Sequence, residues 1–221
     1  MNNEYFKLID TPEKAYFLGL FHADGSCTKQ IRNTYEELRF QISLQEQDRY
    51  ILERFCTEIN LPTSRVKIYR SNRENEQNKA NLYISKKAFT LHLVDLKSES
   101  LQHRIPENLK PDFIRGFFDG DGSIYVRRNK NKILFYGVSY ICLGWIGNYI
   151  LSNIPVELKL RADKRTPNLF SIETNKKENI IKLYEYMYNT ATTLKLERKY
   201  KKFKEAFEFA STTIPKGSRT K

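Results

Sequence analysis

The chain contains few cysteines: Cys27, Cys56 and Cys142. Their number is odd, and neither a Cys-x-x-Cys pair nor a Cys/His spacing typical of zinc ligands occurs. We therefore expect neither a disulfide framework nor a structural zinc site, and three reduced thiols.

Long apolar runs are also missing from the sequence. No stretch approaches the roughly 18–20 apolar residues of a membrane span. The N-terminal Met-Asn-Asn-Glu-Tyr lacks the charged and apolar regions of a signal peptide. These absences predict an intracellular protein of the cytoplasm or an organelle matrix, neither secreted nor bound to a membrane.

Acidic residues are in short supply, with 26 Asp and Glu against 38 Lys and Arg, a net charge of +12. Such an excess favours a polyanionic partner, above all nucleic acid, over a neutral small molecule. Hydrophobic residues make up 40% of the chain and aromatic residues 13%. This composition is sufficient for a folded core of substantial size.

One acid-tipped pattern occurs twice, as Phe17-Leu-Gly-Leu-Phe-His-Ala-Asp-Gly25 and as Ile114-Arg-Gly-Phe-Phe-Asp-Gly-Asp-Gly122, with Ser after each copy. Each copy indicates a buried helix that ends on a carboxylate, Asp24 or Asp121. Thr11-Pro12-Glu13 is a helix-start signal before the first copy, and Pro111-Asp112 opens the second in the same way.

Small residues recur on one face of each of these two helices. Gly19 and Ala23 are four residues apart in the first, as are Gly116 and Gly120 in the second. Small side chains let two helices pack with their backbones unusually close. We expect Gly19 and Gly116 to form such an interface, and if the two helices pair, Asp24 and Asp121 lie side by side.

The same order of elements follows each copy. In the first half Leu38, Phe40, Ile42 and Leu44 alternate with polar residues as in a strand, and a helix over 48–59 and a hairpin over 66–84 follow. The second half offers strands near 124–127 and 133–143, a helix to about 154, and a hairpin over 156–173. We predict an α+β protein of two pseudo-symmetric αββαββα halves, 1–96 and 111–221, joined by a linker over 97–110. Tyr200, Phe203 and Phe207 add a helix near the C-terminus, before a polar, basic tail.

The two motifs resemble the LAGLIDADG motif of homing endonucleases, and the resemblance covers nearly the whole chain. Lys97, in Leu-Lys-Ser, is similar to a Lys-Ser segment of that family, and Lys199, in Leu-Glu-Arg-Lys-Tyr, is similar to its later counterpart. One departure is the acid two places before the last Asp of the motif, which is Asp119 in the second copy but His22 in the first. We read His22 as a packed or solvated residue rather than a metal ligand.

The resemblance implies a monomeric, single-chain endonuclease whose two sheets form a saddle over double-stranded DNA. It implies that Asp24 and Asp121 bind two or three shared Mg²⁺ ions, with the backbone carbonyls of Ala23 and Gly120 completing the metal shell. Lys97, Lys199 and Gln45 would be the other catalytic residues. The position matching Gln45 in the second half is Gly144. The implied reaction is a double-strand break with short 3′ overhangs at a long asymmetric site.

Alternation along the strands predicts which side chains face DNA. They are of types that bind the edges of bases or the phosphates of DNA. The predicted DNA-facing residues are Gln30, Arg32, Arg39, Gln41, Lys67, Tyr69, Tyr83, Tyr125, Arg127, Lys159 and Arg161.

Two alternatives stay open at this point. An RNA-binding intron maturase could use the same basic scaffold, with intron RNA as its partner, and a DNA-binding regulator could keep the scaffold without cleavage. Intact Asp24 and Asp121 favour the nuclease, because a protein that only binds a polyanion has no need of two carboxylates facing it.

Overall fold

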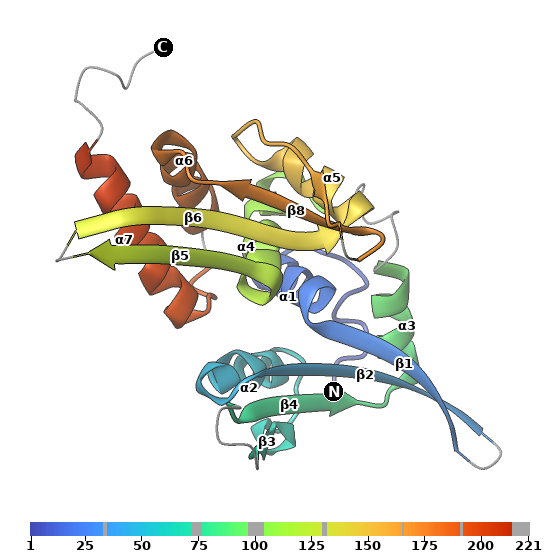
Figure 1. Cartoon of the computed structure of the whole chain (residues 1–221). Coiled ribbons are helices and arrows are strands. Elements are labelled where there is room, and N and C mark those ends of the chain that lie inside the picture. Colours follow the sequence, from blue (N-terminus) through green and yellow to red (C-terminus); the bar gives the residue numbers. More distant parts are fainter. Residues whose placement is uncertain are drawn as a thin grey trace. The chain divides into compact units, whose positions relative to one another are not determined.

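The structure is a computed structural model that describes residues 1–32, 35–71, 77–96, 104–129, 132–164, 166–190 and 192–213 (Figure 1). Contacts between Cα atoms divide the chain into two compact units, Met1–Gly120 and Asp121–Lys221. The division expected from the sequence, 1–96, 97–110 and 111–221, follows the repeated pattern instead and remains a prediction. The expected C-terminal tail lies outside the described residues.

The first unit contains the elements of the first repeat together with α4 of the second. Its sheet 1 is four-stranded, in the order β1-β2-β4-β3, and every neighbouring pair is antiparallel. The elements of this unit are α1 (Pro12–Ala23), β1 (Gly25–Arg32), β2 (Tyr35–Gln45), α2 (Arg49–Glu58), β3 (Lys67–Tyr69), β4 (Lys79–Ile84), α3 (Lys87–Leu96) and, up to its last residue, α4 (Lys110–Asp121).

Helix α1 begins where its sequence signals predict. Thr11 is the N-cap, and its hydroxyl accepts a hydrogen bond from the Lys14 amide at 3.3 Å. Pro12 occupies the first helical position, where its missing amide hydrogen costs nothing. Every residue from 15 to 21 is buried, so α1 is enclosed around its whole circumference rather than along one stripe.

An aromatic cluster forms the core of the first unit. Phe55 of α2 contacts the rings of Phe17 and Phe21 of α1, with ring centroids 4.9 and 4.8 Å apart. Phe40 of β2 and Phe89 of α3 complete the cluster from the sheet and from the following helix. Full burial of such a side chain contributes roughly 1.5–3 kcal/mol each. This cluster fixes α1 against its own sheet and thereby the position of the motif that α1 ends on.

The second unit repeats the same strand order. Sheet 2 is four-stranded and antiparallel, in the order β5-β6-β8-β7. Helix α7 packs on β5 and against α6, and α5 packs on β6 and β8. The elements are β5 (Gly122–Asn129), β6 (Lys132–Leu143), α5 (Gly144–Asn153), β7 (Arg161–Ala162), β8 (Leu169–Thr174), α6 (Lys177–Tyr188) and α7 (Glu197–Thr213).

The hairpin expected over 156–173 is wrong in its first strand. Residues 157–160 are not in a strand, and β7 comprises only Arg161 and Ala162. Leu160 serves a different contact, because its side chain packs against Gly147 of α5. Lys159 therefore lies in an exposed segment before β7 rather than in the sheet.

The C-terminal helix is confirmed. Tyr200, Phe203 and Phe207 of α7 all contact the ring of Tyr184 of α6, and the Phe207 and Tyr184 rings stack with centroids 4.3 Å apart. The helical spacing of these aromatic residues thus produces the docking of α7 that it predicts.

The fold class expected from the sequence is confirmed: an α+β protein with two antiparallel sheets of the same strand order, each preceded by a motif helix. Among the described residues, no helix combines the length and the apolar character that crossing a lipid bilayer requires.

Candidate active site and nucleic-acid interface

Helices α1 and α4 touch backbone to backbone at two glycines. A Cβ atom on Gly19 would overlap the carbonyl oxygen of Phe113 and lie 2.8 Å from the amide nitrogen of Phe117. A Cβ atom on Gly116 would overlap the carbonyl oxygen of Tyr16. Any side chain at these two positions would separate the helices, so the close approach depends on glycine.

Asp24 stands at the end of α1, where it is the C-cap residue and is exposed to solvent. Its own amide donates to the carbonyl of Leu20 at 2.9 Å, so the backbone that carries the carboxylate is held by the last helical turn. Gly120 of α4 lies beside it, since a Cβ atom there would be 3.1 Å from Asp24 Oδ2 and would overlap the Cβ atom of Ala23. Ala23, Asp24 and Gly120 are therefore in direct contact.

Asp121 directly follows Gly120 and is the last residue of α4. It is half-buried. Burial, with the negative charge of Asp121 as the second cause, raises the pKa of the Cys142 thiol to about 12. Cys142 of β6 consequently stays a protonated, uncharged neighbour of this carboxylate at neutral pH.

Lys199 lies in the first turn of α7 and is buried, with 7% of its surface exposed. Its ammonium group donates to the carbonyl of Gly122 at 2.6 Å. Because Gly122 follows Asp121 in the chain, Lys199 anchors the backbone next to the second motif acid. The sequence could not predict this buried contact, because Lys199 stands in a run of several lysines. Lys97 lies outside the described residues.

Gln45 is the last residue of β2 and is half-buried. Its side-chain oxygen accepts a hydrogen bond from Gln47 Nε2 at 2.6 Å. Gly144, its expected counterpart, is the first residue of α5. The asymmetry expected between the two halves at this position is thus also one of secondary structure.

A buried polar cluster joins α1 to α4. It includes Tyr16 and Arg115, for which the sequence suggested no role. Tyr16 donates to Asp119 Oδ2 at 2.8 Å, and Arg115 forms an ion pair with Asp112 at 2.7 Å. The guanidinium carbon of Arg115 lies 5.5 Å from the centroid of the Tyr16 ring. A charged residue among apolar ones in a motif helix is the signal that could have identified this cluster, because buried charges need partners.

The two motif copies differ where their sequences differ. Asp119 accepts the hydrogen bond from Tyr16, whereas Nε2 of His22 lies 2.9 Å from the carbonyl oxygen of Leu96 at the end of α3. A carbonyl accepts and does not donate, so His22 carries its proton on Nε2 in this contact. The reading of His22 as a packed residue agrees with this contact.

The register of sheet 1 places the predicted DNA-facing residues on one face. Directly paired residues of antiparallel strands share a face, and Gln41 pairs with Tyr83 while Lys67 pairs with Asn81. The opposite face carries Phe40, Ile42 and Leu82, which are buried. The side chains of Gln30, Arg32 and Arg127 lie outside those that the structure describes. The described residues of this polar face are Ser26, Thr28, Glu37, Arg39, Gln41, Ser43, Gln45, Lys67, Tyr69, Lys79, Asn81 and Tyr83.

Within this polar face, the cations and aromatic rings are exposed to different degrees. Tyr69 is 53% exposed and Lys67 is exposed, whereas Arg39 is half-buried. Arg39 forms an ion pair with Glu37 at 3.5 Å, and its guanidinium carbon lies 5.7 Å from the centroid of the Tyr83 ring. Lys67 and Tyr69 of β3 and Lys79 of β4 are therefore exposed groups that this face presents to a polyanion.

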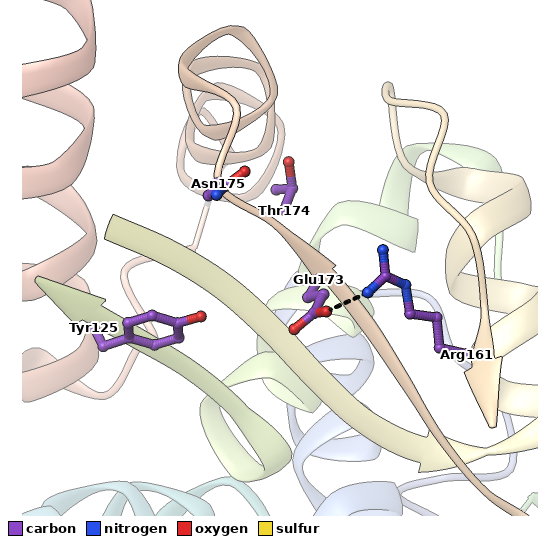
Figure 2. A pocket seen from close by; sticks show the side chains of 5 residues that line it. All are labelled: Tyr125, Arg161, Glu173, Thr174 and Asn175. Carbon is purple, nitrogen blue, oxygen red and sulfur yellow. Dashed lines mark hydrogen bonds and ion pairs between the residues drawn. The ribbon is translucent and has the colours of Figure 1, made fainter. Parts of the chain in front are cut away.

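Sheet 2 carries a smaller set of polar residues around a hollow of about 280 Å³ (Figure 2). Tyr125 and Arg161 were expected to face DNA, and both line the hollow. Glu173, Thr174 and Asn175 also line it and were not predicted as site residues. The strand alternation does place Glu173 on the polar side of β8, but an acidic residue gives no reason to expect contact with a polyanion.

Oxygen donors of the kind that Mg²⁺ prefers stand at the end of α1, on a carboxylate and on the backbone. Among the described residues, no three His, Cys, Asp or Glu side chains gather as a metal-binding group. The exposed carboxylate of Asp24, next to the backbone of Ala23 and Gly120, offers the hard oxygen donors that Mg²⁺ prefers, and Mg²⁺ usually takes only one or two carboxylates and keeps several waters. The residues at the end of α1 therefore fit this ion.

No protein-family model matches the chain. An uncharacterized protein of Methanocaldococcus jannaschii is 25% identical over 138 residues, 61% of this chain but only half of that relative's length.

Solved structures match over nearly the whole chain. The LAGLIDADG homing endonuclease I-GzeII in complex with its DNA target has a TM-score of 0.65 and 14% identity, over 96% of this chain and 94% of its own. I-SmaMI bound to uncleaved DNA in the presence of calcium ions has a TM-score of 0.61 and 13% identity, over 92% and 91%. The meganuclease I-AabMI, bound to uncleaved DNA, has a TM-score of 0.59 and 14% identity, over 92% and 91%. Two acid-tipped helices that meet at glycines, two sheets of one strand order and these matches together establish that the chain has the fold of the LAGLIDADG homing endonucleases.

Proposed function

We propose that this protein is a Mg²⁺-dependent DNA endonuclease that makes a double-strand break with short 3′ overhangs at a long asymmetric site, acting as a monomer. The observation that carries the proposal is the repeated Asp-Gly at the ends of α1 and α4 on this fold. The net charge of +12 supports a polyanionic substrate. Intron homing is the biological role that the fold suggests.

Asp24 and Asp121 are the residues proposed to hold Mg²⁺, with the carbonyls of Ala23 and Gly120. When bound, the metal supplies an activated water and stabilises the leaving oxygen of the phosphodiester. The backbone on which Asp24 stands is fixed by the hydrogen bond from its amide to the Leu20 carbonyl, so the position from which the carboxylate extends is held by the helix. Each acid serves one strand of the duplex in this proposal.

Lys199 is proposed to stabilise negative charge that develops at the phosphate near Asp121. Its ammonium group has three N–H donors, of which the bond to Gly122 uses one. That bond holds the ammonium beside the backbone of the second motif. Lys97 and Gln45 are the proposed partners in the first half.

The test is cleavage of a randomised duplex DNA library by the full-length protein in Mg²⁺, with sequencing of the cut ends. Wild type is compared with Asp24→Asn and Asp121→Asn, and Asp95→Asn is the matched control because Asp95 is an exposed acid of α3. We expect wild type and Asp95→Asn to make discrete cuts with 3′ overhangs. The two motif variants should bind the selected site and make no double-strand break.

Two outcomes would count against this function. Full cutting by Asp24→Asn or by Asp121→Asn would remove the replaced acid from the mechanism and overturn the paired-acid proposal. Binding of RNA or DNA by wild type without any cutting in Mg²⁺ would favour the maturase or the regulator.

A further inference from the structure

The hollow on sheet 2 is formed by residues from three strands. Tyr125 comes from β5, Arg161 from β7 and Glu173 from β8, and Thr174 and Asn175 close it at the end of β8 (Figure 2). The strand between β5 and β8 is β6, in which Gly137 pairs with Tyr125 and Ser139 pairs with Glu173. By this register Tyr125 and Glu173 lie on the same face of sheet 2.

Arg161 and Glu173 form an ion pair at the edge of the hollow. Arg161 Nη1 donates to a carboxylate oxygen of Glu173 at 2.9 Å, and the two side chains are 70% and 44% exposed. Ion pairs this exposed contribute only about 0–1 kcal/mol to stability. The ion pair of Arg161 with Glu173 therefore contributes little to the stability of the fold.

The pair is also poorly suited to holding a DNA phosphate. A carboxylate at 2.9 Å offsets the positive charge of Arg161 and repels a phosphate that approaches it. What the pair does offer is a fork of N–H donors beside an acceptor. A guanidinium has five N–H groups and this bond uses one, so most donors are left for another partner.

One edge of DNA presents the complementary pattern. In the major groove, a G·C pair shows two acceptors on guanine, O6 and N7, next to the N4 amino donor of cytosine. An A·T pair places its donor between two acceptors, which does not suit a bidentate guanidinium. Tyr125 is 43% exposed and lines the same hollow as Arg161 and Glu173.

We propose that this hollow reads one G·C base pair of the target, with Arg161 donating to guanine and Glu173 accepting from the N4 group of the paired cytosine. The inference rests on the DNA binding of the proposed function and is independent of cleavage. Glu173 is the specificity-determining residue beside Arg161, because a carboxylate accepts from the N4 group of cytosine and repels the O4 acceptor of thymine at that place, while Arg161 requires the two acceptors of guanine. Replacing Glu173 by Gln keeps the shape and adds a donor, so the choice of base relaxes.

The test is selection of bound sequences from a randomised duplex DNA library by the full-length protein in Ca²⁺, followed by sequencing. Wild type is compared with Glu173→Gln and Arg161→Gln. Glu157→Gln is the matched acidic control and Lys159→Ala the matched basic control, since both residues are exposed and neither lines the hollow.

We expect wild type to require G·C at one position of its site. Glu173→Gln and Arg161→Gln should both lose that requirement at the same position, with discrimination falling about tenfold to hundredfold. Glu157→Gln should keep the wild-type profile, and Lys159→Ala should bind all sequences more weakly without a change of preference.

Three results would overturn the inference while leaving the endonuclease intact: no change of preference in Glu173→Gln, changes at different positions in the two variants, or tighter binding of all sequences alike in Glu173→Gln. If wild type selects no DNA sequence at all, the DNA binding on which both proposals rest is itself wrong.

Discussion

The hydroxyl of Tyr16 in α1 donates a hydrogen bond to Asp119 in α4, at 2.8 Å and across 103 residues of chain. Both side chains have no exposed surface. Burial, followed by the charge of Asp119, raises the pKa of Tyr16 well above its ordinary value. The phenol therefore remains a protonated donor at neutral pH.

Removing this donor should destabilise the first unit. We expect Tyr16→Phe to lower the free energy of unfolding by about 1–3 kcal/mol, because a buried carboxylate loses a hydrogen bond that water cannot replace. Urea unfolding measures the loss. Tyr69→Phe is the control, since Tyr69 is 53% exposed and should change stability little. Equal stability of Tyr16→Phe and wild type would show that the bond contributes nothing.

The contact between the backbones of α1 and α4 should tolerate no side chain. In Gly19→Ala the new methyl group would overlap the Phe113 carbonyl, and backbone atoms cannot yield as a flexible side chain can. We expect a loss of about 1–3 kcal/mol or more in the free energy of unfolding. Thermal unfolding of Gly19→Ala is compared with Ser152→Ala, at an exposed position of α5. A Gly19→Ala protein with the wild-type midpoint would contradict the observed packing.

Lys199 should have a structural effect that is separable from catalysis. Lys199→Met keeps the length of the side chain but removes the donor to Gly122, so the second unit should lose about 1–3 kcal/mol even without DNA or metal. Lys202→Met, on the exposed side of α7, should lose far less. Unfolding in EDTA measures both. If Lys199→Met loses cleavage but no stability, the contact with Gly122 is incidental.

Two buried thiols should make the protein sensitive to alkali. Burial is the main cause that raises the pKa of Cys56 to about 11 and of Cys142 to about 12, from an ordinary value of 9.0. Their folded pKa lies above the unfolded one, so the contribution to stability is complete below pH 9 and is lost as pH rises from about 9 toward 11 and 12. At pH 10 the loss is roughly 1.4 kcal/mol for each thiol.

The measurement is the free energy of unfolding at pH 7 and at pH 10, for wild type and for the Cys56→Ala/Cys142→Ala variant. The variant is expected to be less stable at pH 7 because of the cavities, and to lose less between the two pH values. An equal loss in both proteins would mean that the thiols ionise in the folded state as they do in the unfolded one.

Local signals predicted most of the fold because each reflects a physical constraint on one element. Thr11-Pro12 fixed the start of α1, and the alternation from Leu38 to Leu44 matched the two faces of β2. Alternation misled at Leu158 and Leu160, which are not in a strand, and Leu160 packs against helix α5 rather than under a sheet. A two-residue period shows which side chains are apolar, but it does not predict whether a sheet or a helix packs against them.

The candidate site was less accessible from sequence than the fold. The acids Asp24 and Asp121 could be found because they are repeated with their surroundings. The bond from Lys199 to Gly122 could not, because it joins residues 77 apart in the chain. The pair of Arg161 with Glu173 could not, because it depends on the exact register of two strands and has no repeat to point to it. Only the register of β7 on β8 and the docking of α7 on β5 bring these partners together.

Helix α4 opens the second repeat of the sequence, yet all of it but Asp121 belongs to the first compact unit, where Gly116 lies against Tyr16. The boundary between the two sequence repeats and the boundary between the two compact units thus differ by one helix, α4. A chimera that exchanges halves with a relative at the linker would replace α4 while keeping α1, and so would place a foreign surface against Gly19. Exchange at the strand that follows Asp121 would keep the matched pair together and should give the more stable hybrids.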